Sequence, residues 1–556
     1  MICRKYPIFT TTNVFEYFYY GLFMDKKAAF RSLLFRHLDG LVMTPVTYVL
    51  GQHKVLQHIC NEKQVDITEL SKKFNANEGY MNVALRMFSS QGWMTQALDN
   101  KTNTVAYHIT PEGELAFKHH EVYKETFEFI QHSFKFIKAD VEPEFFFKLD
   151  RAVKSYKACM EIVEHDNKEV ADQIRTHIEG AIVGPIIVQL GMGGMFHKYF
   201  MEASFSPEEF HRNPQDFRKI LDFLSHIEWF NKTDNGHYEF TDKGLFFAKR
   251  STAYGVTVSY LPLFRNVEEM LFGDPHAIRD TGEDEDEKHV DREMNVWGSG
   301  GAHATYFKVM DEIIMELFNR PIEEQPKGIL DMGCGNGAFL QHAFDVVERY
   351  TLRGKMLDEH PLFLVGADYN QAALKVTRAN LIKSDIWAKV IWGDIGRPDV
   401  LAKDLKENYK IELKDLLNVR TFLDHNRIWS EPKKQTKGRI STSTGAYVHR
   451  GERLSNNLVE DNLLEHLQKW APYVEKFGLL MIELHTVPPD LVAQNLGKTA
   501  ATAYDATHGF SDQYIVEIDV FHKVAKEAGL IPDKEFYRQF PDSDLGTISI
   551  NLLKGK

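Results

Sequence analysis

The stretch Gly328-Ile-Leu-Asp-Met-Gly333-Cys-Gly335-Asn-Gly337 decides the fold of this 556-residue chain. It has the pattern of a short apolar strand that runs into a turn with a glycine at every second position, followed by a helix at residues 338–350. A glycine-rich turn between a buried strand and a helix is typical of the first β-α unit of a doubly wound fold. The spacing differs from the GxGxxG pattern of dinucleotide-binding proteins, so the turn alone does not identify a ligand.

Two more candidate strands follow, and each ends beside an acidic residue. The apolar run at 363–367 leads into Asp368, and the run at 389–392 leads into Asp394 and Ile395. A carboxylate at the end of the second strand can accept hydrogen bonds from both hydroxyls of a ribose, and one after the third can accept from an adenine amino group. The three strand ends together predict a nucleotide-type ligand.

These three motifs resemble the first three motifs of class I S-adenosylmethionine-dependent methyltransferases. The resemblance implies an α/β Rossmann-like methyltransferase domain in the C-terminal region. A Rossmann-like domain that binds another nucleotide is the alternative. The resemblance also implies contacts to the methionine part of the cofactor from Asp331, Gly333, Gly335 and Gly337, to the ribose from Asp368, and to the adenine from Asp394 and Ile395.

Three further strands complete the predicted sheet, at residues 416–423, 479–484 and 548–553, with a helix at 515–528 before the last of them. A polar and aromatic insertion at 495–514 follows the fifth strand. Such long insertions tend to be active-site loops, because ligands bind outside the carboxyl ends of the strands.

Three histidines fall on this side of the predicted sheet. His425 lies next to Asp424 after the fourth strand, His485 follows the fifth strand, and His508 lies in the insertion. His425, His485 and Gln513 offer the mixed nitrogen and oxygen ligands that suit a divalent iron or manganese ion. Equally, His425 or His508, oriented by a carboxylate such as Asp424, is suited to be a general base. The spacing leaves both interpretations open.

The region before residue 290 is predicted to be mostly helical, with two winged-helix-like units. The first has helices at 67–74 and 80–90 and a hairpin with arms at 93–98 and 104–109. The pattern of residues 107–113 returns at 238–244, which indicates an internal duplication. The helix at 80–90 contains Arg86 as its one arginine, which is too little charge for phosphate binding. A role of this unit in dimerisation or in covering the substrate is therefore favoured.

Changes in composition along the chain predict four segments. The acidic run at 282–287 is interpreted as a solvated loop, the glycine-rich stretch at 295–303 as a folded loop, and the apolar stretch at 180–196 as a buried, broken helix. The predicted segments are an N-terminal extension at 1–33, a winged-helix-like domain at 34–120, a helical region with the second winged-helix-like unit at 121–290, and the methyltransferase domain at 291–556.

Composition excludes several classes of protein. Apolar residues make up 43% and charged residues 26%, which are ordinary values for a globular protein. The net charge of −13 disfavours nucleic acid as a partner. Four dispersed cysteines fit a reducing compartment, and the N-terminus lacks the pattern of a signal peptide. A cytoplasmic protein without a membrane segment is therefore expected.

The segments at 295–303, 420–427 and 504–514 narrow the resemblance to the methyltransferase portion of polyketide synthase loading modules, of the apratoxin and saxitoxin type. Those enzymes use a mononuclear metal and methylate an acyl group on an acyl carrier protein. This chain ends at Lys556 without room for the domains that follow there, so a carrier protein would act in trans, or the acceptor would be a free small molecule.

The predicted reaction is methylation of a carbon in an acyl or polyketide-type acceptor, with the enolate stabilised by a metal or by the histidines. One alternative is a small-molecule O-methyltransferase that uses a histidine base and pairs its catalytic domain with a dimerising winged helix. The alternative of another class is a winged-helix regulator that senses a ligand.

Overall fold

The structure, a computed structural model, describes residues 11–133, 143–163, 167–199, 204–280 and 287–556. The chain separates into two compact units, each assembled from segments that are distant in sequence. The first unit contains residues 1–48, 119–258 and 495–500, and the second contains 49–118, 259–494 and 501–556. These units do not follow the order of the chain, so the division at residues 34, 121 and 291 stays a prediction.

The second unit is built around a mostly parallel sheet, which confirms the predicted Rossmann-like architecture. Five neighbouring strands, β12, β9, β6, β7 and β8, are mutually parallel, and β15 pairs antiparallel with β12. The strand order is β13 (Leu530–Pro532), β15 (Ile548–Gly555), β12 (Leu479–Leu484), β9 (Leu416–Thr421), β6 (Gly328–Met332), β7 (Phe363–Asp368) and β8 (Ala388–Trp392), with β14 (Arg538–Phe540) paired to β15. The order reverses at β6 and β9, so the carboxyl ends of these two strands flank the crevice where ligands bind in such sheets.

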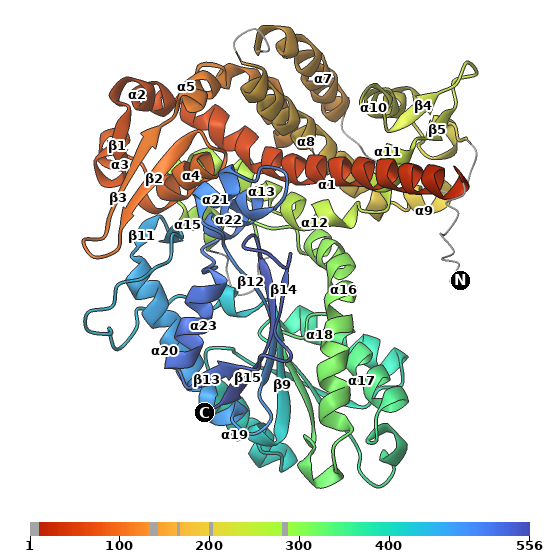
Figure 1. The fold of residues 1–556 in the computed structure, drawn as a ribbon, viewed down its shortest axis with the longest axis vertical. Helices are drawn as coiled ribbons and strands as arrows, with labels where there is room; N and C mark the ends of the chain where they lie inside the picture. The colour runs from red at the N-terminus through yellow and green to blue at the C-terminus, as the bar shows by residue number, and fades with distance from the viewer. Residues whose placement is uncertain (1–10, 134–142, 164–166, 200–203, 281–286) are drawn as a thin grey trace, which may run out of the picture. The chain divides into compact units, whose positions relative to one another are not determined.

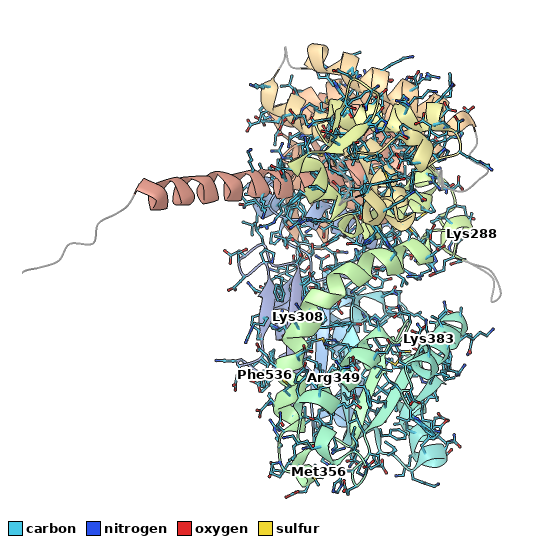
Figure 2. The ribbon with its side chains drawn as sticks, turned by 90° about the vertical axis from the view of Figure 1, so that its right-hand side faces the viewer. Lys288, Lys308, Arg349, Met356, Lys383 and Phe536 are labelled. Atoms are coloured by element: carbon cyan, nitrogen blue, oxygen red, sulfur yellow. The ribbon has the colours of Figure 1, made fainter. Side chains whose placement is uncertain are left out.

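Helices cover both faces of this sheet (Figure 1). One face carries α16 (Arg292–Phe318), α17 (Ala338–Tyr350) and α18 (Gln371–Lys383), and the other carries α19 (Pro398–Tyr409), α20 (Asn456–Val474) and α23 (Ile518–Glu527). Each layer has its own apolar core against the sheet. Figure 2 shows the first layer, with the exposed Lys308, Arg349 and Lys383 on its three helices. Because helices cover both faces of the sheet, a ligand can reach the sheet only at the ends of its strands.

The first winged-helix unit forms as predicted and lies in the second compact unit. It comprises β1 (Gln64–Asp66), α3 (Ile67–Phe74), α4 (Glu78–Ser90), β2 (Met94–Asp99) and β3 (Thr104–Ile109). Helix α4 is buried from Gly79 to Ser90 and packs against α21 (Pro489–Ala493) and α22 (Ala501–Gly509). Arg86, the one arginine of α4, forms a buried ion pair with Asp505. The helix that would read DNA in other winged-helix proteins is therefore engaged inside this molecule.

The second winged-helix unit lies in the first compact unit, at α10 (Pro214–His226), β4 (Phe230–Lys232), β5 (Tyr238–Phe240) and α11 (Asp242–Ala248). It repeats the local geometry of the first. In both copies a threonine N–H donates to a tryptophan carbonyl at 3.1 Å, from Thr110 to Trp93 and from Thr241 to Trp229. The two threonine hydroxyls accept from the N–H groups of Gly113 and Gly244, each at 3.0 Å. The sequence repeat therefore corresponds to a structural repeat.

Long helices form the rest of the first unit. At the crossing of α1 (Thr11–Gln52) and α8 (Lys168–Met192), a Cβ atom on Gly40 would lie 2.2 Å from the carbonyl oxygen of His177, and one on Gly180 would lie 2.4 Å from that of His37. Glycine is needed at both positions because the two backbones touch. The helices are α1 (Thr11–Gln52), α6 (Lys124–Gln131), α7 (Pro143–Val163), α8 (Lys168–Met192), α9 (Met195–Tyr199) and α12 (Thr252–Ser259), and the short helices of the second unit are α2 (Val55–Glu62), α5 (Pro111–Lys118), α13 (Leu261–Arg265), α14 (Val267–Phe272) and α15 (His276–Arg279).

Three loop and helix predictions need correction. Residues 295–303 are not a folded loop but part of α16, which starts where the Asp291 side chain accepts from the Met294 N–H at 3.0 Å. The insertion at 495–514 contains the helix α22. The buried helix at 180–196 is confirmed, but it runs unbroken through Pro185 and is interrupted at Gly194, which has a φ of +79°. Most of the predicted acidic loop, residues 282–286, lies outside the described residues.

Across the described segments, no helix is both long and apolar enough to cross a lipid bilayer.

Candidate active site

The glycine turn after β6 has an open side next to Asp368. Gly333, Gly335 and Gly337 adopt φ values of +83°, +53° and +81°, which side chains disfavour. The N–H of Gly335 donates to Asp368 Oδ2 at 3.0 Å. A Cβ atom built on Gly335 would meet no described atom within 4 Å. The turn thus offers backbone, a carboxylate and free space at one point, which fits a bound cofactor.

Helix α18 holds this turn in place from behind. Thr377 Oγ1 donates to the carbonyl of Gly335 at 2.7 Å, and Asn380 Nδ2 donates to the carbonyl of Asn336 at 2.9 Å. Asp368 is oriented as well, because its Oδ1 accepts from the N–H of Asn370 at 2.9 Å. These hydrogen bonds therefore hold the glycine turn and the Asp368 carboxylate in position without a ligand.

The third strand end joins the same edge of the sheet. The N–H of Gly393 donates to the carbonyl of Asp368 at 3.1 Å, which ties the end of β8 to the end of β7. Asp394 Oδ1 accepts from the N–H of Gly396 at 2.7 Å, and the carbonyl of Ile395 accepts from Trp470 Nε1 at 2.7 Å. All seven residues predicted to bind the cofactor thus lie at the carboxyl ends of β6, β7 and β8, although their individual contacts stay predictions.

Asp331 is the one carboxylate of this group that is enclosed. Its side chain is 1% exposed, and its Oδ1 has no hydrogen-bond partner among the described residues. Burial, and then the charge of Asp368, raises the pKa of Asp331 to about 8. The neutral form is therefore favoured in the folded chain near neutral pH.

This raised pKa makes folding stability depend on pH. The stabilising effect of a neutral Asp331 is complete below about pH 4 and is lost as the pH rises toward about 8, at up to roughly 1.4 kcal/mol per pH unit. We expect Asp331→Asn to flatten the pH dependence of the free energy of unfolding, measured by urea denaturation between about pH 5.5 and 7.5. Asp358→Asn, in an exposed turn, serves as the control. Parallel curves for wild type and Asp331→Asn would contradict the assignment.

His425 forms a buried pair with a carboxylate on the neighbouring strand. It lies in a short 3₁₀ helix after β9, and its Nδ1 hydrogen-bonds to Glu483 Oε1 of β12. The His425 N–H also donates to Glu483 Oε2 at 3.2 Å. Because the carboxylate accepts the Nδ1 proton, Nε2 of a neutral His425 carries a free lone pair. This is the arrangement of a general base.

His508 stands beside this pair. The two imidazole centroids are 5.1 Å apart, and His508 Nδ1 donates to the carbonyl of Tyr504 at 2.7 Å. Burial, and then the proximity of His425, lowers the pKa of His508 to about 3. His508 is therefore neutral, and its Nε2 can accept a hydrogen bond.

The carboxylate that orients His425 is not the neighbouring Asp424. Asp424 Oδ1 instead accepts from Arg420 Nη1 at 2.5 Å and from His466 Nε2 at 3.0 Å. Burial alone would raise the pKa of Asp424, but Arg420 and then His466 lower it to about 2. Sequence reasoning missed Glu483, although a charged residue inside the apolar run at 479–484 is a signal, because a buried carboxylate needs a partner.

The predicted metal ligands do not form a metal site. His485 Nδ1 donates to the carbonyl of Val516 at 3.0 Å, and its Nε2 accepts from Ser549 Oγ at 2.7 Å, so neither nitrogen is free. Gln513 Nε2 donates to the hydroxyl of Tyr260 at 3.3 Å. Within the ranges that the structure describes, no group of three or more His, Cys, Asp and Glu side chains could hold a metal ion. The iron or manganese hypothesis therefore gains no support.

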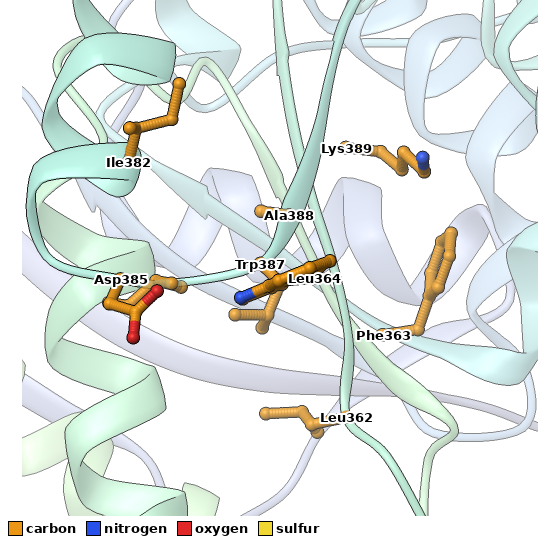
Figure 3. Close-up of a pocket in the computed structure, with 9 residues that line it drawn as sticks. Leu362, Phe363, Leu364, Ile382, Asp385, Trp387, Ala388 and Lys389 are labelled. Atoms are coloured by element: carbon orange, nitrogen blue, oxygen red, sulfur yellow. The ribbon is translucent and has the colours of Figure 1, made fainter.

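A cavity of about 520 Å³ lies at the amino ends of β7 and β8, away from the candidate active site (Figure 3). Its lining includes Phe363 and Ala388, the first residues of β7 and β8, together with Trp387 and Lys389. The predicted cofactor residues lie at the other ends of the same strands. This cavity is therefore separate from the candidate active site.

Three family models match the chain in sequence order. They are the AprA N-terminal domain at residues 30–96, the AprA winged helix domain at 179–274 and the AprA MT2-like domain, a methyltransferase domain, at 287–551. No curated protein matches the chain.

Similar solved structures have low identity to this chain. An O-methyltransferase family protein from Burkholderia thailandensis is 9% identical, with a TM-score of 0.38 over 67% of this chain and 95% of that one. An O-methyltransferase family 2 protein from Planctomyces limnophilus in complex with apigenin is 9% identical, with a TM-score of 0.36 over 94% and 96%. PigF with SAH is 11% identical, with a TM-score of 0.37 over 70% and 99%. From its domain order and its methyltransferase domain, the chain belongs to the AprA-type S-adenosylmethionine-dependent methyltransferases.

Proposed function

We propose that this methyltransferase methylates a carbon next to a carbonyl in an acyl or polyketide-type acceptor, with His425 as general base. The observation that carries the proposal is the buried pair of His425 and Glu483. Strand β9, which leads to His425, is the direct neighbour of β6, which leads to the glycine turn. The base and the predicted cofactor site therefore lie at adjacent strand ends.

S-adenosylmethionine, when bound, supplies an electrophilic methyl group on its sulfonium. His425 Nε2 would take the proton from the acceptor carbon and leave an enolate, whose electron pair forms the new bond to the methyl carbon. The new carbon–carbon bond would replace the carbon–sulfur bond of the cofactor, with S-adenosylhomocysteine as the leaving group. Glu483 stabilises the imidazolium that forms, in the way a carboxylate supports the histidine of a catalytic triad.

Several details of this proposal rest on composition and fold. A free small molecule or an acyl group on a separate carrier protein is the proposed acceptor, and nucleic acid is not proposed, because α4 is buried and the net charge is −13. We place the reaction in the cytoplasm, and a homodimer through the winged-helix units stays a prediction. O-Methylation is the alternative outcome, because the same base could deprotonate a hydroxyl group.

The test is to locate the transferred methyl group. Purified protein is incubated with ¹³C-methyl S-adenosylmethionine and with acetoacetate or its N-acetylcysteamine thioester, and the products are examined by NMR. A new C–CH₃ resonance is expected, in the presence or absence of a chelator. An O–CH₃ product would shift the assignment to O-methylation, loss of transfer on chelation would restore the metal mechanism, and no transfer to any acyl acceptor would reject the proposal.

A further inference from the structure

Four buried side chains near His425 and His508 carry polar atoms that have no hydrogen-bond partner among the described residues. They come from α15, from the segment before α16 and from the segment after α22. The unsatisfied atoms are Nε and Nη1 of Arg279, Nδ1 of His289, Oγ of Ser511 and Oε1 of Gln513. Unpaired polar atoms inside a protein cost free energy, so such a group points to a partner that binds there.

The four side chains are enclosed. His289, Ser511 and Gln513 are 5%, 1% and 6% exposed, and the side chain of Arg279 is 10% exposed. Arg279 Nη2 donates to the carbonyl of Ser511 at 2.6 Å. Gln513 donates to the hydroxyl of Tyr260, whose ring centroid lies 6.4 Å from that of His289. These contacts connect the four residues into one cluster, which we call the polar subsite.

The polar subsite adjoins the proposed catalytic histidines. The backbone N–H groups of Ser511 and Gln513 both donate to the carbonyl of His508, at 3.1 and 2.9 Å. The next residue, Tyr514, donates its N–H to the carbonyl of His425 at 2.8 Å. The ring centroid of Tyr260 is 6.2 Å from that of His508. A molecule held in the polar subsite would therefore lie beside both imidazoles.

The chemistry of the unsatisfied atoms indicates what is bound. A guanidinium group has only donors, and its planar fork matches carbonyl and carboxylate oxygens. Asp512 lies 3.6 Å from Arg279 Nε, and Arg450 pairs with both Asp512 and Asp280. The two carboxylates balance the charges of the two arginines, so a neutral carbonyl is as suitable a ligand for Arg279 as a carboxylate. Burial, and then the charges of Arg279, Arg292 and Arg450, lowers the pKa of His289 to about 2, so His289 is neutral. A guanidinium group offers no lone pair to a metal ion, so the free atoms of Arg279 fit an oxygen acceptor and not a metal.

We propose that Arg279, with His289, Ser511 and Gln513, binds a carbonyl-type oxygen of the methyl acceptor and so selects acyl substrates. This inference rests on the proposed function and adds the residues that recognise the substrate. Arg279 donates through Nε and Nη1 to that oxygen, and Gln513 Oε1 accepts from a donor group elsewhere on the same molecule. Held in this way, the acceptor presents the atom next to its carbonyl to the histidines.

Binding of defined probes to the full-length protein, saturated with S-adenosylhomocysteine, tests the subsite by calorimetry. The probes are acetoacetate, a free carboxylate, and acetoacetyl N-acetylcysteamine, a thioester that mimics a carrier-bound acyl group. Arg279→Lys keeps the charge beside Asp512 and removes the fork, so we expect a rise of about 10- to 100-fold in the dissociation constant of the preferred probe. Gln513→Leu should weaken the same probe without removing any charge. Affinity for S-adenosylmethionine and the melting temperature should stay close to wild type.

The matched control is Arg349→Lys, an exposed arginine on the same unit (Figure 2). Unchanged probe affinity in Arg279→Lys and Gln513→Leu would overturn the inference, whether or not the protein transfers methyl groups. Iron or manganese that is retained by wild type and lost from Gln513→Leu would also overturn it, by assigning the cluster to a metal. Arg279-dependent binding without any methyl transfer would keep the subsite and reject the proposed reaction.

Discussion

Replacing Gly335 with valine is expected to abolish binding of S-adenosylmethionine. The Gly335 N–H contacts Asp368, its φ is +53°, and the space that a Cβ atom would enter is free of described atoms. A branched side chain would fill that space and also strain the backbone. Calorimetric titration should show no binding up to millimolar cofactor. Asp368→Ala should give the milder loss of about 1.5–3 kcal/mol, the range for hydrogen bonds to a charged group.

A matched control separates loss of the site from backbone strain. Gly438 has a φ of +75°, also has free space around its Cβ position and lies in an exposed loop. Gly438→Val should therefore carry a similar strain and bind the cofactor like wild type. If Gly335→Val kept the wild-type dissociation constant, the turn could not face the cofactor.

Removing the imidazole of His425 is expected to lower kcat by about 10² to 10⁴-fold, the contribution of a general base. The cofactor residues lie on β6, β7 and β8, so affinity for S-adenosylmethionine should be nearly unchanged in His425→Ala. Glu483→Gln keeps a hydrogen-bond acceptor but removes the negative charge that stabilises the imidazolium, so kcat should also fall. Stopped assays with labelled cofactor across a range of pH measure both effects.

Two other histidine contacts provide the controls. His342 pairs with Asp311 at 2.6 Å outside the site, so His342→Ala should keep kcat. Asp424→Asn should lower the free energy of unfolding, because Asp424 pairs with Arg420 and His466. Its kcat should fall far less than that of His425→Ala. Full activity of His425→Ala would reject His425 as the base, and the neutral His508 beside it would become the candidate.

The sequence by itself determined the strands of the sheet and the three strand ends that are predicted to bind the cofactor. Strand, glycine turn and helix at 328–350 are local patterns, and the carboxyl ends of neighbouring parallel strands must meet, so Asp368 and Asp394 could be placed from order alone. The winged-helix units were also predictable, because hairpin arms and helix periodicity depend on residues close in the chain. The stretch at 295–303 was misjudged because its glycines suggested a loop, while the cap at Asp291 and the apolar residues after it support a helix.

Only the tertiary structure decided which partner each buried polar side chain has. It joined His425 to Glu483, 58 residues away, and gave the adjacent Asp424 to Arg420 and His466. It used both nitrogens of His485 in hydrogen bonds, and it left Arg279 and Gln513 with free polar atoms in one place. Such pairings depend on distances between segments that are far apart in the chain. Hydrophobic periodicity determines which face of an element is buried, but the desolvation of each polar group, and the partner that offsets it, is set only when the elements pack together.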